Sequence, residues 1–199
     1  MDVPKIEFRY SEIYDYSLKT WTKSNKKNSA RHYSELKILK YSNSVEKLWR
    51  KYEIKILREL SKITGLSWKE KRIVCYIVGN CIPFSDPLTL PIYKNKNDFI
   101  DCLVHELIHR LFTQKGNYEK SKKAWSYIFR KYKKERYNTI IHIPVHAVHS
   151  HIYIKFFGKN RMKRDKKNIS FLKEYKRSWE TVEKEDYGNI TGKFKNLTQ

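Results

Sequence analysis

The sequence predicts an α+β fold that is mostly helical and contains a small sheet. Several segments repeat apolar residues every three or four positions, as amphipathic helices do. The run 72–78 is short, β-branched and followed by Gly79 and Asn80, which is typical of a buried strand. With 40% apolar and 15% aromatic residues the 199-residue chain can build a core, so the composition argues against wholesale disorder.

Three extended segments supply the expected sheet. Residues 4–10 alternate weakly between apolar and polar side chains, and 72–78 reads as the buried strand. Residues 88–93 are extended too, but Pro91 lacks a backbone N–H and therefore favours an edge strand.

The helices follow from apolar periodicity and from their end signals. Ser44 is the expected N-cap of the first helix and Gly65 its stop signal. Pro144 suits the first turn of the helix that begins near 143. We expect 158–169 to be a charged linker and the tail after 186 to be frayed. The predicted helices span 44–64, 97–113, 119–135, 143–157 and 170–186.

Composition excludes several classes of protein. Six Gly and five Pro rule out collagen-like chains, and no apolar run reaches the roughly 18–20 residues of a membrane span. The first residues do not resemble a signal peptide, and the three cysteines, Cys75, Cys81 and Cys102, are an odd number. We therefore expect a reduced, cytoplasmic protein without a membrane partner or a disulfide framework.

The net charge of +22 suggests a nucleic-acid partner. However, 32 of the 43 basic residues are Lys and only 11 are Arg, and the chain is also rich in Ile, Asn and Tyr. These residues have AT-rich codons, so genome composition alone explains much of the lysine. Proteins that read bases or grip phosphates tend to use the bidentate Arg fork. Nucleic acid therefore stays an alternative partner.

The segment His105–His109 reads His-Glu-Leu-Ile-His, an HExxH motif, inside the predicted helix 97–113. Side chains at i and i+4 lie on one helix face, so both imidazoles can reach one metal ion. Glu106 can then act as the general base for a water molecule that zinc activates. The alternative interpretation is a helix whose two histidines make ordinary surface hydrogen bonds.

Residues 88–112 resemble the core of zincin metallopeptidases, in which an edge strand and a loop precede the HExxH helix. This resemblance implies a zinc ion bound by His105 and His109, with Glu106 as general base and acid. The rest of the chain is similar to small, uncharacterised microbial HExxH proteins. We accordingly expect an N-terminal segment over 1–45, a zincin-like catalytic core over 46–157, and a basic linker with a C-terminal helix packing on the core over 158–199.

The third zinc ligand is open at the sequence level. Six of the seven histidines fall between residues 105 and 151, so we favour His142 or His146, which would complete a three-histidine site with one position left for water. Glu180 or Glu183 is the alternative. The interpretation without a metal is that these histidines form hydrogen bonds to backbone groups or carboxylates inside a buried helix.

Two further residues, His149 and Tyr153, share a predicted helix face with His146 and are candidates for stabilising an oxyanion. Cys81 and Cys102 with the two motif histidines would form a mixed structural metal site, but a C-x₂-C pair is absent. Cys102 and Cys75 are better interpreted as core residues.

The sequence therefore predicts a zinc metallopeptidase that acts on a protein or peptide substrate. The alternative is a basic nucleic-acid-binding protein, using the stretch 155–177 in which aromatic residues interleave with basic ones. That protein would carry a structural metal, or would resemble the SprT-like proteases that cut DNA-bound proteins. The oligomeric state is not predicted.

Overall fold

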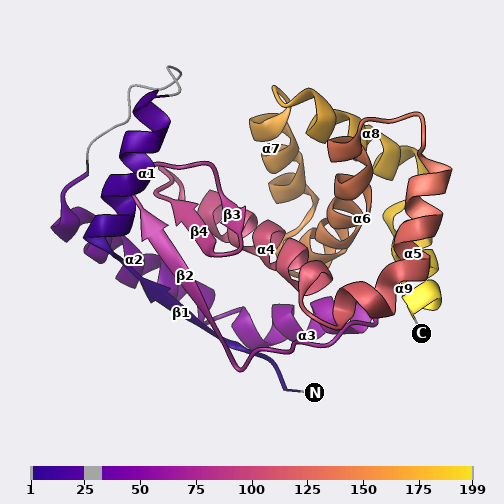
Figure 1. The fold of residues 1–199 in the computed structure, drawn as a ribbon, viewed down its shortest axis with the longest axis horizontal. Coiled ribbons are helices and arrows are strands. Elements are labelled where there is room, and N and C mark those ends of the chain that lie inside the picture. Colours follow the sequence, from indigo (N-terminus) through magenta and orange to yellow (C-terminus); the bar gives the residue numbers. More distant parts are fainter. Residues whose placement is uncertain (1, 25–32, 199) are drawn as a thin grey trace. The chain divides into compact units, whose positions relative to one another are not determined.

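The computed structural model describes residues 2–24 and 33–198 (Figure 1). The chain divides into two compact units, one formed by residues 2–54 and 70–107 and the other by 55–69 and 108–199. Two helices, α3 (Glu53–Thr64) and α4 (Lys96–Thr113), contribute residues to both units. Within the described ranges, no helix combines the length and the apolar character that a membrane span needs.

The first unit contains the sheet, so the described chain is α+β, mostly helical, with a small mixed sheet. Its strands lie in the order β1-β2-β4-β3, of which the first three are parallel and β3 is antiparallel to β4. The prediction of the strand at 72–78 is confirmed. The strands are β1 (Lys5–Arg9), β2 (Arg72–Val78), β3 (Phe84–Ser85) and β4 (Leu88–Pro91).

The prediction that 88–93 forms the sheet edge is wrong. The chain turns at Asp86-Pro87, which folds the two residues of β3 back against the outer side of β4. Phe84 thus pairs with Thr89 and Ser85 with Leu88. A two-residue strand is too short to show an alternating pattern, so the sequence did not reveal it.

The same unit contains α1 (Glu12–Ser24) and α2 (Glu35–Trp49), and the predicted helix 44–64 proves to be two helices. The chain leaves the helix at Arg50, whose guanidinium bonds to Glu46, to Glu53 and to the carbonyl of Ile6 in β1. Glu53 also accepts the Ile6 N–H at 2.8 Å. These hydrogen bonds link strand β1 to the start of α3, and they explain why the helix is interrupted between α2 and α3.

Ser44 is not a helix N-cap. It lies within α2, where its hydroxyl donates to the carbonyl of Tyr41. The extended N-cap of α2 is Ser34, ten residues earlier. The predicted helix 44–64 therefore covers the end of α2, the break after it and the whole of α3.

The second unit is helical in its described residues. The prediction of a helix over 119–135 is confirmed by α5, whose bounds lie a few residues earlier than expected. Its elements, besides the parts of α3 and α4, are α5 (Asn117–Lys131), α6 (Tyr137–Ile152), a π-helical turn (Tyr153–Phe157), α7 (Lys159–Ile169), α8 (Lys173–Glu185) and α9 (Tyr187–Thr198).

Helix α6 begins six residues earlier than predicted, and Pro144 lies inside it. A proline interior to a helix removes one backbone hydrogen bond. Here the helix is nevertheless kept, because it is buried along most of its length and packs against α8 and α9. His142 consequently belongs to a regular helix and not to the turn before it.

The charged segment 158–169 is helix α7 and not a linker, and the expected frayed tail is helix α9. Helix α7 has no buried residue, but Lys166 pairs with Glu183 of α8 and the Arg161 guanidinium lies 3.9 Å from the ring centroid of Phe157. Helix α9 buries Ile190 and Phe194. Ion pairs and tertiary packing thus form helices that apolar periodicity alone did not predict.

Candidate metal centre

The HExxH motif lies in helix α4, as predicted. The side chain of Asn95 accepts a hydrogen bond from the backbone N–H of Asn97 at 2.9 Å and caps the start of the helix. Seven apolar side chains anchor the helix, and all are almost fully buried: Phe99, Ile100, Leu103, Val104, Leu107, Ile108 and Leu111. A rigid, buried helix therefore holds the two motif histidines one turn apart.

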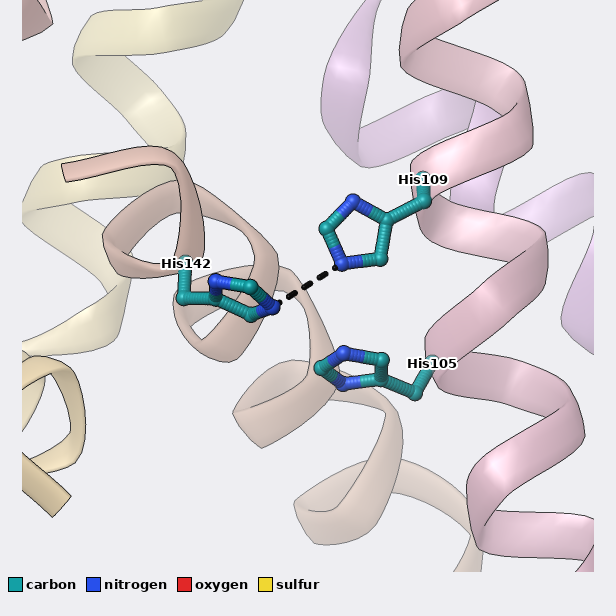
Figure 2. A group of neighbouring side chains, drawn as sticks. All are labelled: His105, His109 and His142. Atoms are coloured by element: carbon teal, nitrogen blue, oxygen red, sulfur yellow. Dashed lines mark hydrogen bonds between the residues drawn. The ribbon is translucent and has the colours of Figure 1, made fainter. Parts of the chain in front are cut away.

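Three histidines form a compact group (Figure 2). The potential ligand nitrogens of His105, His109 and His142 all lie within 4.8 Å of one another. The Nε2 atoms of His109 and His142 lie 3.2 Å apart, and their ring planes are inclined at 72°. His105 is carried by the same continuous helix as His109, while His142 comes from α6.

The ring of His142 has its orientation fixed by the backbone of its own helix. Its Nδ1 lies 2.7 Å from the carbonyl oxygen of Asn138, which can only accept a hydrogen bond. The proton is therefore assigned to Nδ1, which leaves the Nε2 lone pair directed at His109. This is the usual way in which a protein selects the tautomer of a metal-binding imidazole.

The donor set fits a zinc ion. Two nitrogens bound tetrahedrally at about 2.0–2.1 Å stand roughly 3.3 Å apart, and the Nε2 atoms of His109 and His142 are 3.2 Å apart. Burial, together with the neighbouring His142, lowers the pKa of His109 to about 3. Burial likewise lowers the pKa of His142 to about 4. Both rings are therefore neutral at pH 7 and can donate a lone pair.

Glu106 stands directly beside the first motif histidine. Its side chain is buried, and this burial raises the pKa of the carboxyl group to about 7. A carboxylate with a pKa near the working pH can both take and return a proton. The residue therefore has the properties that a general base requires.

His146, the other favoured third ligand, is not brought into the group of three. It is fully buried, its Nδ1 lies 2.6 Å from the Ser178 hydroxyl of α8, and its ring stacks on Trp179 at 4.4 Å and 11°. Glu180 and Glu183 are also elsewhere, in ion pairs with basic residues of α7 and α8. Of the four candidates, only His142 joins the motif histidines.

His149 and Tyr153 lie together, with stacked rings 4.3 Å apart and both side chains buried. Neither residue is part of the group formed by His105, His109 and His142. Burial lowers the pKa of His149 to about 3, and the positive charge of Arg161 acts in the same direction. Their suggested contribution to oxyanion binding stays a prediction.

Two contacts of the site were missed at the sequence level. The carbonyl of Asn138 orients His142, and the ring of Tyr175 in α8 packs 4.1 Å from the His142 ring. The first would have followed from the correct start of α6, since Asn138 precedes His142 by one helical turn. No pattern in the sequence singles out Tyr175 among the fifteen tyrosines.

Comparison of the chain with protein-family models, with curated proteins and with solved structures gives no match.

Proposed function

We propose that this chain is a zinc-dependent hydrolase that cleaves peptide bonds in a protein or peptide substrate. The observation that carries this proposal is the 3.2 Å approach of His142 Nε2 to His109 Nε2, because it adds a third imidazole to the two of the HExxH motif. A random pair of helical histidines has no reason to meet a third ring whose Nε2 atom points at one of them.

His105, His109 and His142 would hold the zinc ion. When bound, the ion would supply a Lewis acid and would lower the pKa of water. Glu106 then accepts a proton from the attacking water and returns it to the nitrogen of the leaving amine. The burial of Glu106 keeps that carboxyl ready for both transfers near neutral pH.

Two features favour a catalytic centre over a structural one. Structural zinc sites are closed by four protein ligands, commonly including cysteine, whereas the group found among the described residues has three histidines. A buried carboxylate next to the ligands serves no need of a structural site, and burying it costs free energy. The donor set and Glu106 together therefore favour hydrolysis.

The test combines metal content with activity. We expect protein purified without chelators to contain one zinc per chain and to hydrolyse a casein substrate. Glu106→Gln should keep the zinc and lose activity by about 10²–10⁴-fold, the usual contribution of a general base. Glu180→Gln is the matched control, because this exposed glutamate is the alternative ligand candidate, and it should change neither quantity.

A wild-type protein that binds no stoichiometric zinc would overturn the proposal. Zinc binding with casein hydrolysis that survives Glu106→Gln would overturn the assigned mechanism. Loss of zinc on Glu180→Gln would instead place the third ligand on α8.

A further inference from the structure

The positive charge of the chain is concentrated in one part of it. Residues 55–69 and 108–199 carry 27 Lys and Arg against 9 Asp and Glu, a net +18, while the rest carries 16 against 12, a net +4. An even spread along the chain would place only about half of the +22 in the helical unit. Codon bias acts on the whole sequence, so it does not explain this asymmetry.

Within the helical unit, a basic groove runs between α5 and α9. It has a volume of about 650 Å³ and is lined by side chains of both helices. Among the described residues, its lining contains four exposed cations, Lys122, Lys123, Arg130 and Lys193. The carboxylate in this lining is Glu119, which lies 4.0 Å from the Lys122 ammonium.

We propose that this groove between α5 and α9 binds the phosphate backbone of duplex nucleic acid. Lys122 and Arg130 are eight residues apart on α5, so they are separated by about 12 Å along the helix axis. Duplex DNA presents one negative charge per about 1.7 Å of its axis, so several phosphates fall within this length. Lys193 adds a cation from the facing helix.

The aromatic content of the groove favours a duplex over a single strand. Proteins that bind single strands stack the bases on exposed aromatic rings. The aromatic ring in this lining is Tyr127, which is half-buried, and the ammonium groups of Lys193 and Lys131 lie 5.3 Å and 5.8 Å from its centroid. A ring covered in this way anchors lysines and offers little surface to a base.

The stretch 155–177, predicted as the nucleic-acid surface, is a poorer candidate. Several of its cations are engaged within the fold: Lys155 with Glu59, Lys166 with Glu183 and Arg177 with Glu135. Binding a phosphate there would first require such pairs to separate. We therefore favour the groove between α5 and α9 over the stretch 155–177 as the nucleic-acid surface.

The experiment measures binding of a fluorescent duplex of about 30 base pairs by anisotropy, at several salt concentrations and without added metal. The triple variant Lys123→Gln, Arg130→Gln, Lys193→Gln removes three phosphate contacts. We expect the slope of log K against log salt to become shallower by about 3, and affinity near 0.1 M salt to fall at least about tenfold.

A matched variant removes the same charge from exposed lysines of α2 and the chain just after it, Lys40→Gln, Lys47→Gln, Lys51→Gln. It should retain affinity within about twofold to threefold, since distant charges are screened. The charge-conserving triple Lys123→Arg, Arg130→Lys, Lys193→Arg should also bind like wild type. Circular dichroism of each variant checks that the helices are intact.

Four outcomes would overturn the proposal. They are absence of duplex binding by the wild type near 50 mM salt, equal losses in the groove variant and its matched control, tighter binding of a single strand than of the duplex, and binding of anionic phosphatidylserine vesicles in place of DNA. Zinc plays no part in this binding, so its result is separate from that of the hydrolase test.

Discussion

At the residue scale, His142 and His146 differ in the hydrogen-bond partners of their Nδ1 atoms. They are four residues apart on α6, yet His142 bonds to the carbonyl of Asn138 and points Nε2 at His109. His146 instead bonds to the Ser178 hydroxyl and stacks on Trp179. Four residues advance a helix by about 6 Å along its axis, so His142 meets Tyr175 of α8 while His146 meets Ser178 and Trp179 further along it. One ring is therefore available to a metal and the other serves packing.

This division predicts opposite effects of two alanine substitutions. His142→Ala should weaken zinc binding by more than about 100-fold, because loss of a ligand exceeds the roughly 10–100-fold cost of losing its supporting contacts. His146→Ala should keep zinc but lower the free energy of unfolding by about 2–4 kcal/mol, through a cavity and the loss of the hydrogen bond between His146 and Ser178. Chelator competition and urea unfolding measure the two quantities.

The matched control is His151→Gln on the same helix, whose native ring pairs with Glu59. It should leave zinc affinity unchanged. Zinc loss in His146→Ala with full retention in His142→Ala would reverse the assignment of the third ligand.

At the scale of the element, the segments that the sequence predicted are those in which the apolar residues of the pattern are also the residues that become buried. The strand 72–78 and the helix 97–113 agree with β2 and α4 to within a residue. Helix α7 was missed because its anchors are an ion pair to α8 and a cation–π contact. Helix α9 was missed because Gly188 and Gly192 lower its helix propensity, which packing overrides.

The candidate site shows the same limit. The HExxH spacing identified His105, Glu106 and His109, since that geometry depends only on one helix. The third partner depends on how α6 lies against α4, and the sequence left His142 and His146 as alternatives. Placing Pro144 at a helix start also hid the Asn138 contact that orients His142.

Helix α9 should be a stabilising element and not an appendage. Phe194 is 2% exposed, and its ring centroid lies 5.0 Å from that of Phe112 and 5.4 Å from that of Trp125. We expect Phe194→Ala to lower the free energy of unfolding by about 3–5 kcal/mol in urea denaturation, the usual cost of removing a buried phenyl group. The exposed Asn196→Ala should change it by less than about 0.5 kcal/mol, and equal effects would contradict the packing of α9.

At the scale of the whole molecule, buried neutral histidines couple folding to pH. His149 is fully buried, its pKa is lowered to about 3 by that burial and by Arg161 on α7, and its ring meets Tyr153 and Trp179. In the unfolded chain a histidine titrates near 6.5. Its contribution to stability is therefore complete above pH 6.5 and is lost progressively as pH falls toward 3, because only the unfolded state takes up the proton.

A second group adds to the same trend at lower pH. Burial alone would raise the pKa of Glu59, but hydrogen bonds from Lys155 and His151 outweigh it and hold that pKa below its ordinary value of 4.5. A carboxylate with a lowered folded pKa stabilises the fold above about pH 4.5, and this contribution is lost as pH falls further. Between pH 6.5 and 5 the histidines therefore dominate the pH dependence.

The measurement is the free energy of unfolding in urea at pH 8, 7, 6 and 5, with a chelator present so that zinc linkage does not contribute. For His149 alone the loss between pH 8 and pH 5 should be about 2 kcal/mol. His149→Gln is uncharged throughout this range, so its profile should be flatter than that of wild type by this amount, although its stability at pH 8 can be lower. Parallel profiles for the two proteins would show that the His149 ring takes up a proton in the folded state, which is incompatible with its burial between α6, α7 and α8.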